Sequence, residues 1–422
     1  MIETRPKRNH ERAILIGLEQ EGVSKWDLRD SMEELAELAN SAGAEVVDTI
    51  TQKLQKPTAP YYIGKGKAEL IKDSLQDRQV TSVIFNDELS PAQGRNLENL
   101  LARKVLDRTQ LILDIFAQRA RSREGRLQIE LAQLQYLLPR LTGMWEHLSR
   151  QTGGIGMRGP GETQLEVDRR RVQERIARLE RELESVRKTR AVQRQGRKRH
   201  QWPVASVVGY TNAGKSTLLN LLTGADVVAE NRLFATLDPT TRSFTLPNKQ
   251  RVLLTDTVGF LRKLPHTLIE SFKATLEEVS EADLLIHVVD LSHARVDEQM
   301  EAVDKVTKEL DAYGKQTLIV FNKIDNLADR ELAETYIKRF SGSVAISART
   351  GEGVDKLVQA LQEALSSWRL RLHFRIPTKE SALLAEIHRV GHVLELKYEG
   401  DDAVIVAHVP PHLEAKLSRF SQ

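Results

Sequence analysis

The chain has 422 residues, of which 40% are hydrophobic, and its formal net charge is only +3, so it is no polycation and any binding of an acidic partner must rest on local clusters. No cysteine is present, which excludes disulfides, cysteine-ligated zinc, iron–sulfur clusters and a cysteine nucleophile. The first residues lack the apolar core of a signal peptide. No apolar run approaches the roughly 20 residues of a membrane helix, so we expect a soluble, intracellular protein.

Apolar β-branched runs and amphipathic runs alternate in residues 1–108. The expected strands are RAILIGLE, AEVVDTI, TSVIFND and RKVLDRT, and the expected helices are SMEELAELANSAG, KAELIKDSLQ and SPAQGRNLENLLA. Such alternation predicts a small parallel α/β domain. The stretch IGKGKAEL looks like a phosphate loop but lacks the full spacing and the hydroxyl after lysine, so we interpret it as a turn before a helix.

Residues 109–200 carry a helical pattern with almost no turn signal between about 110 and 140. Apolar residues recur at steps of three and four in two sets: Leu127, Leu131, Leu134, Leu138 and Leu141, then Val172, Ile176, Leu179, Leu183 and Val186. Each set lies on one helix face, which predicts an antiparallel helical hairpin with arms of about 45 Å. Most other positions are Arg, Glu or Gln, so we expect only one stripe of each helix to be buried.

The connector of this hairpin is glycine-rich, with Arg150 and Arg158 as its cations. Its glycines are Gly153, Gly154, Gly156, Gly159 and Gly161. Two interpretations stay open: a flexible turn, or a tip at 152–163 that inserts into folded RNA. The following run, 187–200, holds Lys and Arg but no acid, which is typical of a solvated linker and also suits a phosphate backbone.

The stretch GYTNAGKST, 209–217, lies between an expected strand and an expected helix. Gly209, Gly214, Lys215 and Ser216 fit the pattern G-x-x-x-x-G-K-[ST] of a P-loop. The glycines let backbone N–H groups turn toward phosphate, and the helix start adds its positive dipole. Lys215 can reach the β- and γ-phosphates, and Ser216 can bind Mg²⁺.

Three further motifs follow expected strands between 201 and 368. In DTVG, Asp256 can hold Mg²⁺ through water and the Gly259 N–H can meet a γ-phosphate. In NKID, Asp325 can accept hydrogen bonds from N1–H and the exocyclic amine of guanine, which adenine lacks. In SAR, 347–349, a backbone N–H can reach the guanine O6. Together with the P-loop, and in this order, these motifs predict a GTPase domain.

Two positions bear on hydrolysis. A threonine that binds Mg²⁺ and senses the γ-phosphate should lie in LFATLDPTTRS, where Thr236, Thr240 and Thr241 compete; we favour Thr236 for its separation from Ser216. After DTVG stands Phe260, where many GTPases place a glutamine that orients water. We therefore expect slow intrinsic hydrolysis. The catalytic group is left unassigned, with Lys215, Thr236 and Asn212 as candidates.

Residues 369–422 read as strand, helix, strand, strand, helix, which predicts a small α/β domain. His388 and His392 are four apart, but Gly391 lies between them. We interpret them as surface or core histidines and expect no metal there.

The motifs FATLDPTTR, DTVGF, NKID and SAR, preceded by GGIGMRGPGETQLE, resemble those of the HflX family of GTPases. The likeness extends over nearly the whole chain, including YYIGKGKAEL and LDRTQLILDIFAQRA. It implies a cytoplasmic GTPase that binds GTP and GDP and the large ribosomal subunit, and that splits or rescues ribosomes under stress. It also implies that the N-terminal and helical regions contact ribosomal RNA, with no membrane partner and a monomeric chain.

The nucleotide and metal sites follow from the motifs and this resemblance. In related GTPases an asparagine at position 212 helps hold a monovalent cation, so potassium activation and simple bracing of the loop both stay open. The expected Mg²⁺ ligands are Ser216 and Thr236, with Asp256 acting through water. The expected nucleotide-binding residues are Gly209, Tyr210, Thr211, Asn212, Ala213, Gly214, Lys215, Ser216, Thr217, Phe234, Ala235, Thr236, Leu237, Asp238, Asp256, Thr257, Val258, Gly259, Asn322, Lys323, Ile324, Asp325, Ser347, Ala348 and Arg349.

Two other functions are weighed against a ribosome-remodelling GTPase. One is a GTP-gated module that binds RNA or the ribosome, in which hydrolysis only resets binding. The other is an RNA-modifying GTPase of the same superfamily, a class that usually carries a catalytic cysteine. Since the chain has no cysteine, the second is disfavoured.

Overall fold

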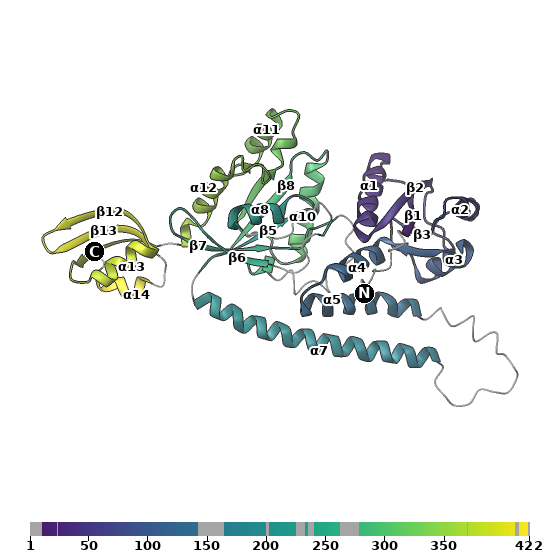
Figure 1. Ribbon diagram of the computed structural model, residues 1–422, viewed down its shortest axis with the longest axis horizontal. Coiled ribbons are helices and arrows are strands. Elements are labelled where there is room, and N and C mark those ends of the chain that lie inside the picture. The colour runs from purple at the N-terminus through teal and green to yellow at the C-terminus, as the bar shows by residue number, and fades with distance from the viewer. Residues whose placement is uncertain are drawn as a thin grey trace, which may run out of the picture. The chain divides into compact units, whose positions relative to one another are not determined.

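The computed structural model describes residues 11–22, 24–141, 164–199, 202–224, 233–234, 240–261, 278–368, 370–409 and 413–420. The chain divides into two compact units, Met1–Glu184 with Leu264–Ser271, and Ser185–Lys263 with Phe272–Gln422. Within the described ranges no helix is long and apolar enough to cross a membrane. The elements are labelled in Figure 1.

A four-stranded parallel sheet of order β2-β1-β3-β4 begins the first unit. Helices begin where the sequence supplies caps: Ser24 with Asp27, and Ser90 with Gln93, form capping boxes. The predicted parallel α/β fold is confirmed, and IGKGKAEL is a turn into α2. The elements are β1 Glu11–Glu19, α1 Lys25–Ala42, β2 Ala44–Lys53, α2 Lys65–Asp77, β3 Ser82–Phe85, α3 Pro91–Leu101, β4 Lys104–Asp107 and α4 Arg108–Arg119.

The first long helix differs from the sequence prediction. The stretch from 110 to 140 forms two helices, α4 and α5 (Arg123–Leu141), because the Ser122 hydroxyl accepts the Gly125 N–H at 2.9 Å and starts a new helix. Glu124 and Gln128 are buried, since α5 packs against α4 as well as its hairpin partner. The expectation of a single buried stripe is therefore wrong for the first half of α5.

The second helix, α7 (Gln164–Arg199), has 36 residues and is about 54 Å long. It pairs antiparallel with α5, and the two helices bury a cluster of Leu127, Leu131, Leu179 and Leu183 between them. An ion pair adds to this contact: Arg175 Nε lies 2.7 Å from Glu130 Oε1, and Arg175 Nη2 lies 2.9 Å from Glu130 Oε2. Figure 1 shows the two helices side by side. The run expected to be a linker continues α7 to Arg199, because Lys, Arg and Gln favour helix. The glycine-rich segment, with Arg150 and Arg158, lies outside the described residues.

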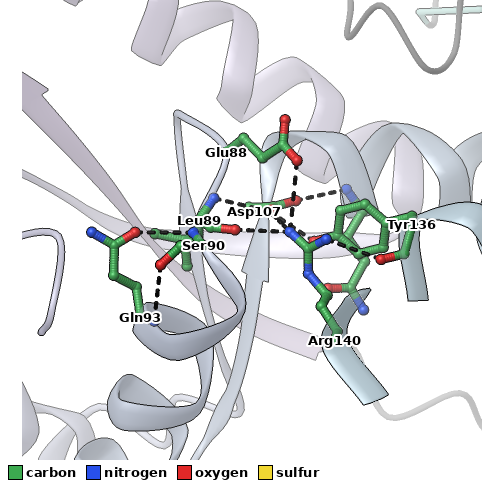
Figure 2. Close-up of polar contacts among 8 residues, drawn as sticks. Glu88, Leu89, Ser90, Gln93, Asp107, Tyr136 and Arg140 are labelled. Carbon is green, nitrogen blue, oxygen red and sulfur yellow. Dashed lines mark hydrogen bonds and ion pairs between the residues drawn. The ribbon is translucent and has the colours of Figure 1, made fainter. Parts of the chain in front are cut away.

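A buried carboxylate fastens α5 to the carboxyl end of β4 (Figure 2). Asp107 is only 2% exposed and accepts hydrogen bonds from the Tyr136 hydroxyl at 2.7 Å, Arg140 Nη2 at 3.3 Å, and the backbone N–H groups of Leu89 and Gln110. The Arg140 guanidinium stacks on the Tyr136 ring at 3.4 Å and donates to the Leu89 carbonyl at 2.8 Å. Burial and the Asp107 charge raise the pKa of Tyr136, so its hydroxyl remains a donor.

The nucleotide domain of the second unit has a six-stranded sheet of order β10-β9-β8-β5-β7-β6, parallel except for the edge strand β6. Its core gathers buried residues of β5, β7, β8 and β9 under α8 and α12. The elements are β5 Val204–Gly209, α8 Lys215–Thr223, β6 Thr240–Thr245, β7 Arg251–Asp256, β8 Leu284–Asp290, α10 Val296–Glu309, β9 Thr317–Asn322, α11 Glu331–Arg339, β10 Val344–Ala345 and α12 Val354–Ala364.

The C-terminal domain is a three-stranded antiparallel sheet of order β11-β13-β12, with helices on one face (Figure 1). It has the predicted strand, helix, strand, strand, helix order. His388 and His392, at the end of α13 and the start of β12, are both exposed. The elements are β11 Leu370–Pro377, α13 Ser381–Val390, β12 His392–Glu399, β13 Asp402–Val409 and α14 Glu414–Leu417.

We predict that Tyr136→Phe loosens α5 in the full-length protein. The change removes a hydrogen bond to a buried charge, worth about 1.5–3 kcal/mol, but keeps the ring under Arg140. Hydrogen exchange at the amides of α5, Leu89 and Gln110 should become faster by about tenfold or more. The control Tyr398→Phe, at a tyrosine that is 66% exposed, should change nothing. Unaltered exchange in Tyr136→Phe would show that Asp107 does not hold α5.

Candidate nucleotide-binding site

Two glycines of the P-loop occupy positions where no other residue fits. Gly209 has φ +152°, and a Cβ there would lie 2.2 Å from the Val288 carbonyl oxygen. Gly214 has φ +94°, and a Cβ there would lie 2.3 Å from Asn322 Nδ2. Contacts so short are forbidden, and positive φ is strained for side chains. The spacing of the motif is therefore fixed by the packing of β5 on β8 and of the loop on β9.

Lys215 is buried at the start of α8 and folds back over the loop. Its Nζ donates to the carbonyl oxygens of Gly209 at 3.2 Å and Tyr210 at 2.7 Å. Burial lowers its pKa to about 8. The Lys323 charge lowers the pKa further, while the negative charge of Asp256 raises it. The ammonium is thus held by the protein's own carbonyls at the place where a P-loop lysine meets phosphate.

Ser216 and Asp256 meet between the first turn of α8 and the end of β7. The Ser216 hydroxyl donates to Asp256 Oδ2 at 2.7 Å, and Asp256 is fully buried. The neighbouring Thr257 hydroxyl donates to the Val207 carbonyl at 2.6 Å, which fixes the end of β7 against β5. A hydroxyl and a carboxylate side by side form the hard-oxygen donor set that Mg²⁺ prefers, so these residues fit the expected ion.

The DTVG motif continues into a backbone pairing with the P-loop. The Phe260 N–H donates to the Gly209 carbonyl at 3.1 Å, and the Thr211 N–H donates to the Phe260 carbonyl at 2.9 Å. The Phe260 side chain is 1% exposed and belongs to the core. A buried ring cannot orient a water molecule. The Thr211 hydroxyl beside it is buried and has no hydrogen-bond partner within the described part of the chain, so it is available to a ligand of the loop.

The structure places two of the three candidate switch threonines in a strand. Thr240 and Thr241 belong to β6, which pairs with β7. The Thr241 and Thr255 hydroxyls are 3.0 Å apart across this pair. Thr236 and its neighbours Ala235, Leu237 and Asp238 lie outside the described residues. The choice of Thr236 stays a prediction.

Asn322 ties two of the loops together, a role that its motif did not reveal. It is 2% exposed; its Nδ2 donates to the Ala213 carbonyl at 2.8 Å, and its Oδ1 accepts the Ala348 N–H at 2.9 Å. The side chain therefore bridges the P-loop and the SAR loop. Because Ala348 already donates to Asn322, the idea that SAR supplies an N–H to the guanine O6 stays a prediction.

Lys323 and Asp325 of NKID have different partners. Lys323 is in the left-handed region, with φ +65°, and its Nζ lies 2.6 Å from Asp290 Oδ2 at the end of β8. Asp325 Oδ2 lies 2.5 Å from Arg349 Nη2. A hydrogen bond from Ser347 lowers the pKa of Asp325, and the Arg349 charge acts in the same direction, so the carboxylate stays ionised. Asp290 is a contributor that sequence reasoning missed, although an acid at a strand end was visible in HVVD.

Asn212 lies at the exposed apex of the P-loop with φ +62°. Asparagine tolerates this left-handed conformation better than most residues. Among the described residues its side chain makes no hydrogen bond, and bracing of the loop by Asn212 stays a prediction. The backbone conformation and the cation-binding interpretation both remain as reasons for an asparagine here.

His287 is a second residue that the sequence analysis did not single out. It lies on β8 opposite Val208 of β5 and is buried. Burial, followed by the charge of Lys215, lowers its pKa to about 4. The imidazole is therefore neutral near pH 7 and adds no positive charge beside Lys215. A histidine inside an otherwise apolar strand was the available signal.

The P-loop after β5, the acid at the end of β7 and the NKID motif after β9 define a P-loop GTPase. Profiles of known families agree: GTP-binding GTPase N-terminal matches residues 29–117, GTP-binding GTPase middle region matches 119–197, and 50S ribosome-binding GTPase matches 204–323. The GTPase HflX of Caldanaerobacter subterraneus is 47% identical over 413 residues, 98% of this chain and 94% of that protein. The chain belongs to the HflX family of GTPases and is a GTP hydrolase.

A second relative supports the same family. The GTPase HflX of Escherichia coli is 47% identical over 379 residues, 90% of this chain and 89% of the relative. Among solved structures, a GTP-binding protein from Sulfolobus solfataricus in complex with GDP is 27% identical and matches 85% of this chain and 99% of its own, with a TM-score of 0.45.

We predict that nucleotide binding takes up a proton through Lys215. In the free protein its pKa is about 8, so the ammonium is charged below that pH and neutral above it. Phosphate favours the charged form, so affinity for GDP should be full near pH 7 and fall above pH 8, with about half a proton taken up at pH 8. Calorimetry in buffers of different ionisation enthalpy measures this uptake. Lys215→Arg, which stays charged, should abolish it; a flat response from pH 7 to 9 would contradict the prediction.

Proposed function

We propose that the chain is a cytoplasmic, monomeric GTPase that binds the large ribosomal subunit and its RNA, and splits or rescues ribosomes under stress. The observation that carries the proposal is the match of residues 204–323 to the family described as 50S ribosome-binding GTPase, in a chain of HflX architecture. We propose four functional segments: 1–108, 109–200, 201–368 and 369–422.

The hairpin of α5 and α7 is suited to carry a contact segment to the ribosome. The hairpin of α5 and α7 is built on a buried leucine cluster, and Asp107 fastens α5 to the α/β domain through Tyr136 and Arg140. A fastened helix gives a rigid support for the glycine-rich segment 152–163. We propose that this segment contacts ribosomal RNA near the peptidyl-transferase region, where glycines permit close approach and Arg150 and Arg158 bind phosphate or bases.

In the proposed nucleotide complex the chain's residues bind and orient GTP. Lys215 moves from the loop carbonyls to the β- and γ-phosphates, and the N–H groups of the P-loop and the start of α8 surround them. Ser216 and Thr236 would hold Mg²⁺, with Asp256 acting through water, and an ion held there would neutralise charge on the phosphate oxygens. Asp325 accepts the N1–H and amine of guanine. These roles rest on the motif positions and the geometry described above.

In the described part of the site, the position after DTVG offers no group that could orient the attacking water, because Phe260 is buried. Lys215 Nζ donates to the loop carbonyls and would move to the phosphates. Slow basal turnover follows, with acceleration by the ribosome. This shortage favours a second candidate function, a GTP-gated ribosome-binding module in which hydrolysis only resets binding. Sedimentation of ribosomes with a non-hydrolysable GTP analogue separates the two: splitting without hydrolysis supports the module.

We further propose that Asn212 helps hold a potassium ion beside the phosphates, where its charge would assist hydrolysis. The supporting observation is an exposed side chain that makes no hydrogen bond within the described residues. Turnover should be faster in potassium than in sodium at equal ionic strength. Asn212→Gly removes the side chain but tolerates φ +62°, so it should abolish the difference without straining the loop. A potassium effect that survives this change would remove Asn212 from the proposal.

The ribosome proposal is tested by replacing residues 152–163 with a short Gly-Ser turn. We predict unchanged GTP affinity and basal turnover, because every nucleotide contact proposed above comes from residues after 200. Ribosome-stimulated turnover and subunit splitting should be lost, while weak, salt-sensitive binding through the basic run 187–200 is retained. Normal splitting by this variant would show that the segment is only a turn. A collapse of basal turnover would show that it supports the nucleotide domain.

A further inference from the structure

Arg349 forms an ion pair with Asp325, the carboxylate that we propose recognises the base. Asp325 Oδ2 and Arg349 Nη2 are 2.5 Å apart, and the Asp325 side chain is only 11% exposed. Arg349, by contrast, is 72% exposed, so its side chain lies over the carboxylate from the solvent side. The two residues come from the loops after β9 and β10, which Asn322 holds together.

Guanine and the Arg349 side chain could bind Asp325 through the same kind of hydrogen-bond donors. The N1–C2–N2 edge of guanine is itself a guanidine, and it offers a carboxylate two N–H donors side by side. The guanidinium of arginine offers the same fork, with a full positive charge. Arg349 and guanine can therefore compete for the same carboxylate, and in this structure Arg349 Nη2 lies 2.5 Å from Asp325 Oδ2.

We propose that Arg349 is an internal competitor for guanine, which pairs with Asp325 when no nucleotide is bound and must leave before the base can bind. This inference rests on the proposed role of Asp325 in base recognition. Arg349 holds the carboxylate in place between nucleotides, and it recaptures Asp325 when the base begins to leave. The result is a lower affinity and a faster release for guanine nucleotides.

Within the described residues, the contacts around Asp325 hold its loop and leave Arg349 exposed to solvent. Asn322 is bonded to both the P-loop and the Ala348 N–H, and Lys323 is paired with Asp290, so the backbone around Asp325 is fixed. Arg349 is mostly in solvent, so its departure breaks an ion pair that water and salt reach from the arginine side. Pairs open to solvent in this way are weak and screened by salt. The competition should therefore shift nucleotide affinity by roughly two- to fivefold.

The test measures binding and release of a fluorescent GDP by full-length Arg349→Ala at low and high salt. We expect affinity to rise roughly two- to fivefold, chiefly through slower release, and the difference from the unmodified protein to shrink as salt screens the pair. Arg330→Ala is a matched control, because Arg330 is 71% exposed and pairs with Glu352 at 2.7 Å. It should leave binding unchanged. Weaker GDP binding by Arg349→Ala would mean that the side chain supports the base, which overturns the proposal.

A second arm separates this inference from the base-reading role itself. Asp325→Asn should weaken GDP binding and favour xanthosine diphosphate, since the amide reverses the donor pattern. In that background Arg349→Ala should no longer tighten nucleotide binding, because the guanidinium has lost its carboxylate. If Arg349→Ala still tightens it, the arginine acts elsewhere and the competition is refuted. If Asp325→Asn leaves base preference unaltered, the assignment of Asp325 fails instead.

Discussion

The nucleotide site depends on one buried amide. Asn322 receives a hydrogen bond from the loop after β10 and gives one to the P-loop, so two segments more than a hundred residues apart hold their shape together. The same amide lies so close to position 214 that only glycine fits there. The loops proposed to read the base and to hold the phosphates are therefore joined through a single side chain. Loss of that amide would leave a backbone acceptor and a donor buried and unsatisfied.

Asp107 in the first unit has a place at a strand end like that of Asn322 in the nucleotide domain. Both residues end a parallel strand, both are buried, and both join that strand to helices or loops distant in sequence. The carboxyl ends of parallel strands gather such groups because the loops that leave them converge at one edge of the sheet. In the nucleotide domain this edge binds a ligand, whereas at Asp107 it secures a helix.

Strand and helix order followed from the sequence because apolar periodicity was clear, as in VASVVG before the P-loop. The break between α4 and α5 was missed, since Ser122 is one weak capping signal inside a helix-favouring run. The nucleotide motifs located the site, but the partners of Asn322, Lys323 and Asp325 could not be read from them. These contacts join residues that only the tertiary fold brings together, as with Asp290 and Arg349.

The directions in which the side chains of α5 point limit where residues can be inserted in or deleted from this helix. Leu127 and Leu131 face α7, while Tyr136 and Arg140, one turn apart, face Asp107. A single inserted residue between these groups would rotate one relative to the other by about 100°, so that both could not be satisfied together. An insertion of seven residues would restore the phase to within about 20°, but it would move the two groups about 10.5 Å further apart along the helix axis. The length of α5 between Leu131 and Tyr136 is therefore constrained by rotation and by rise together.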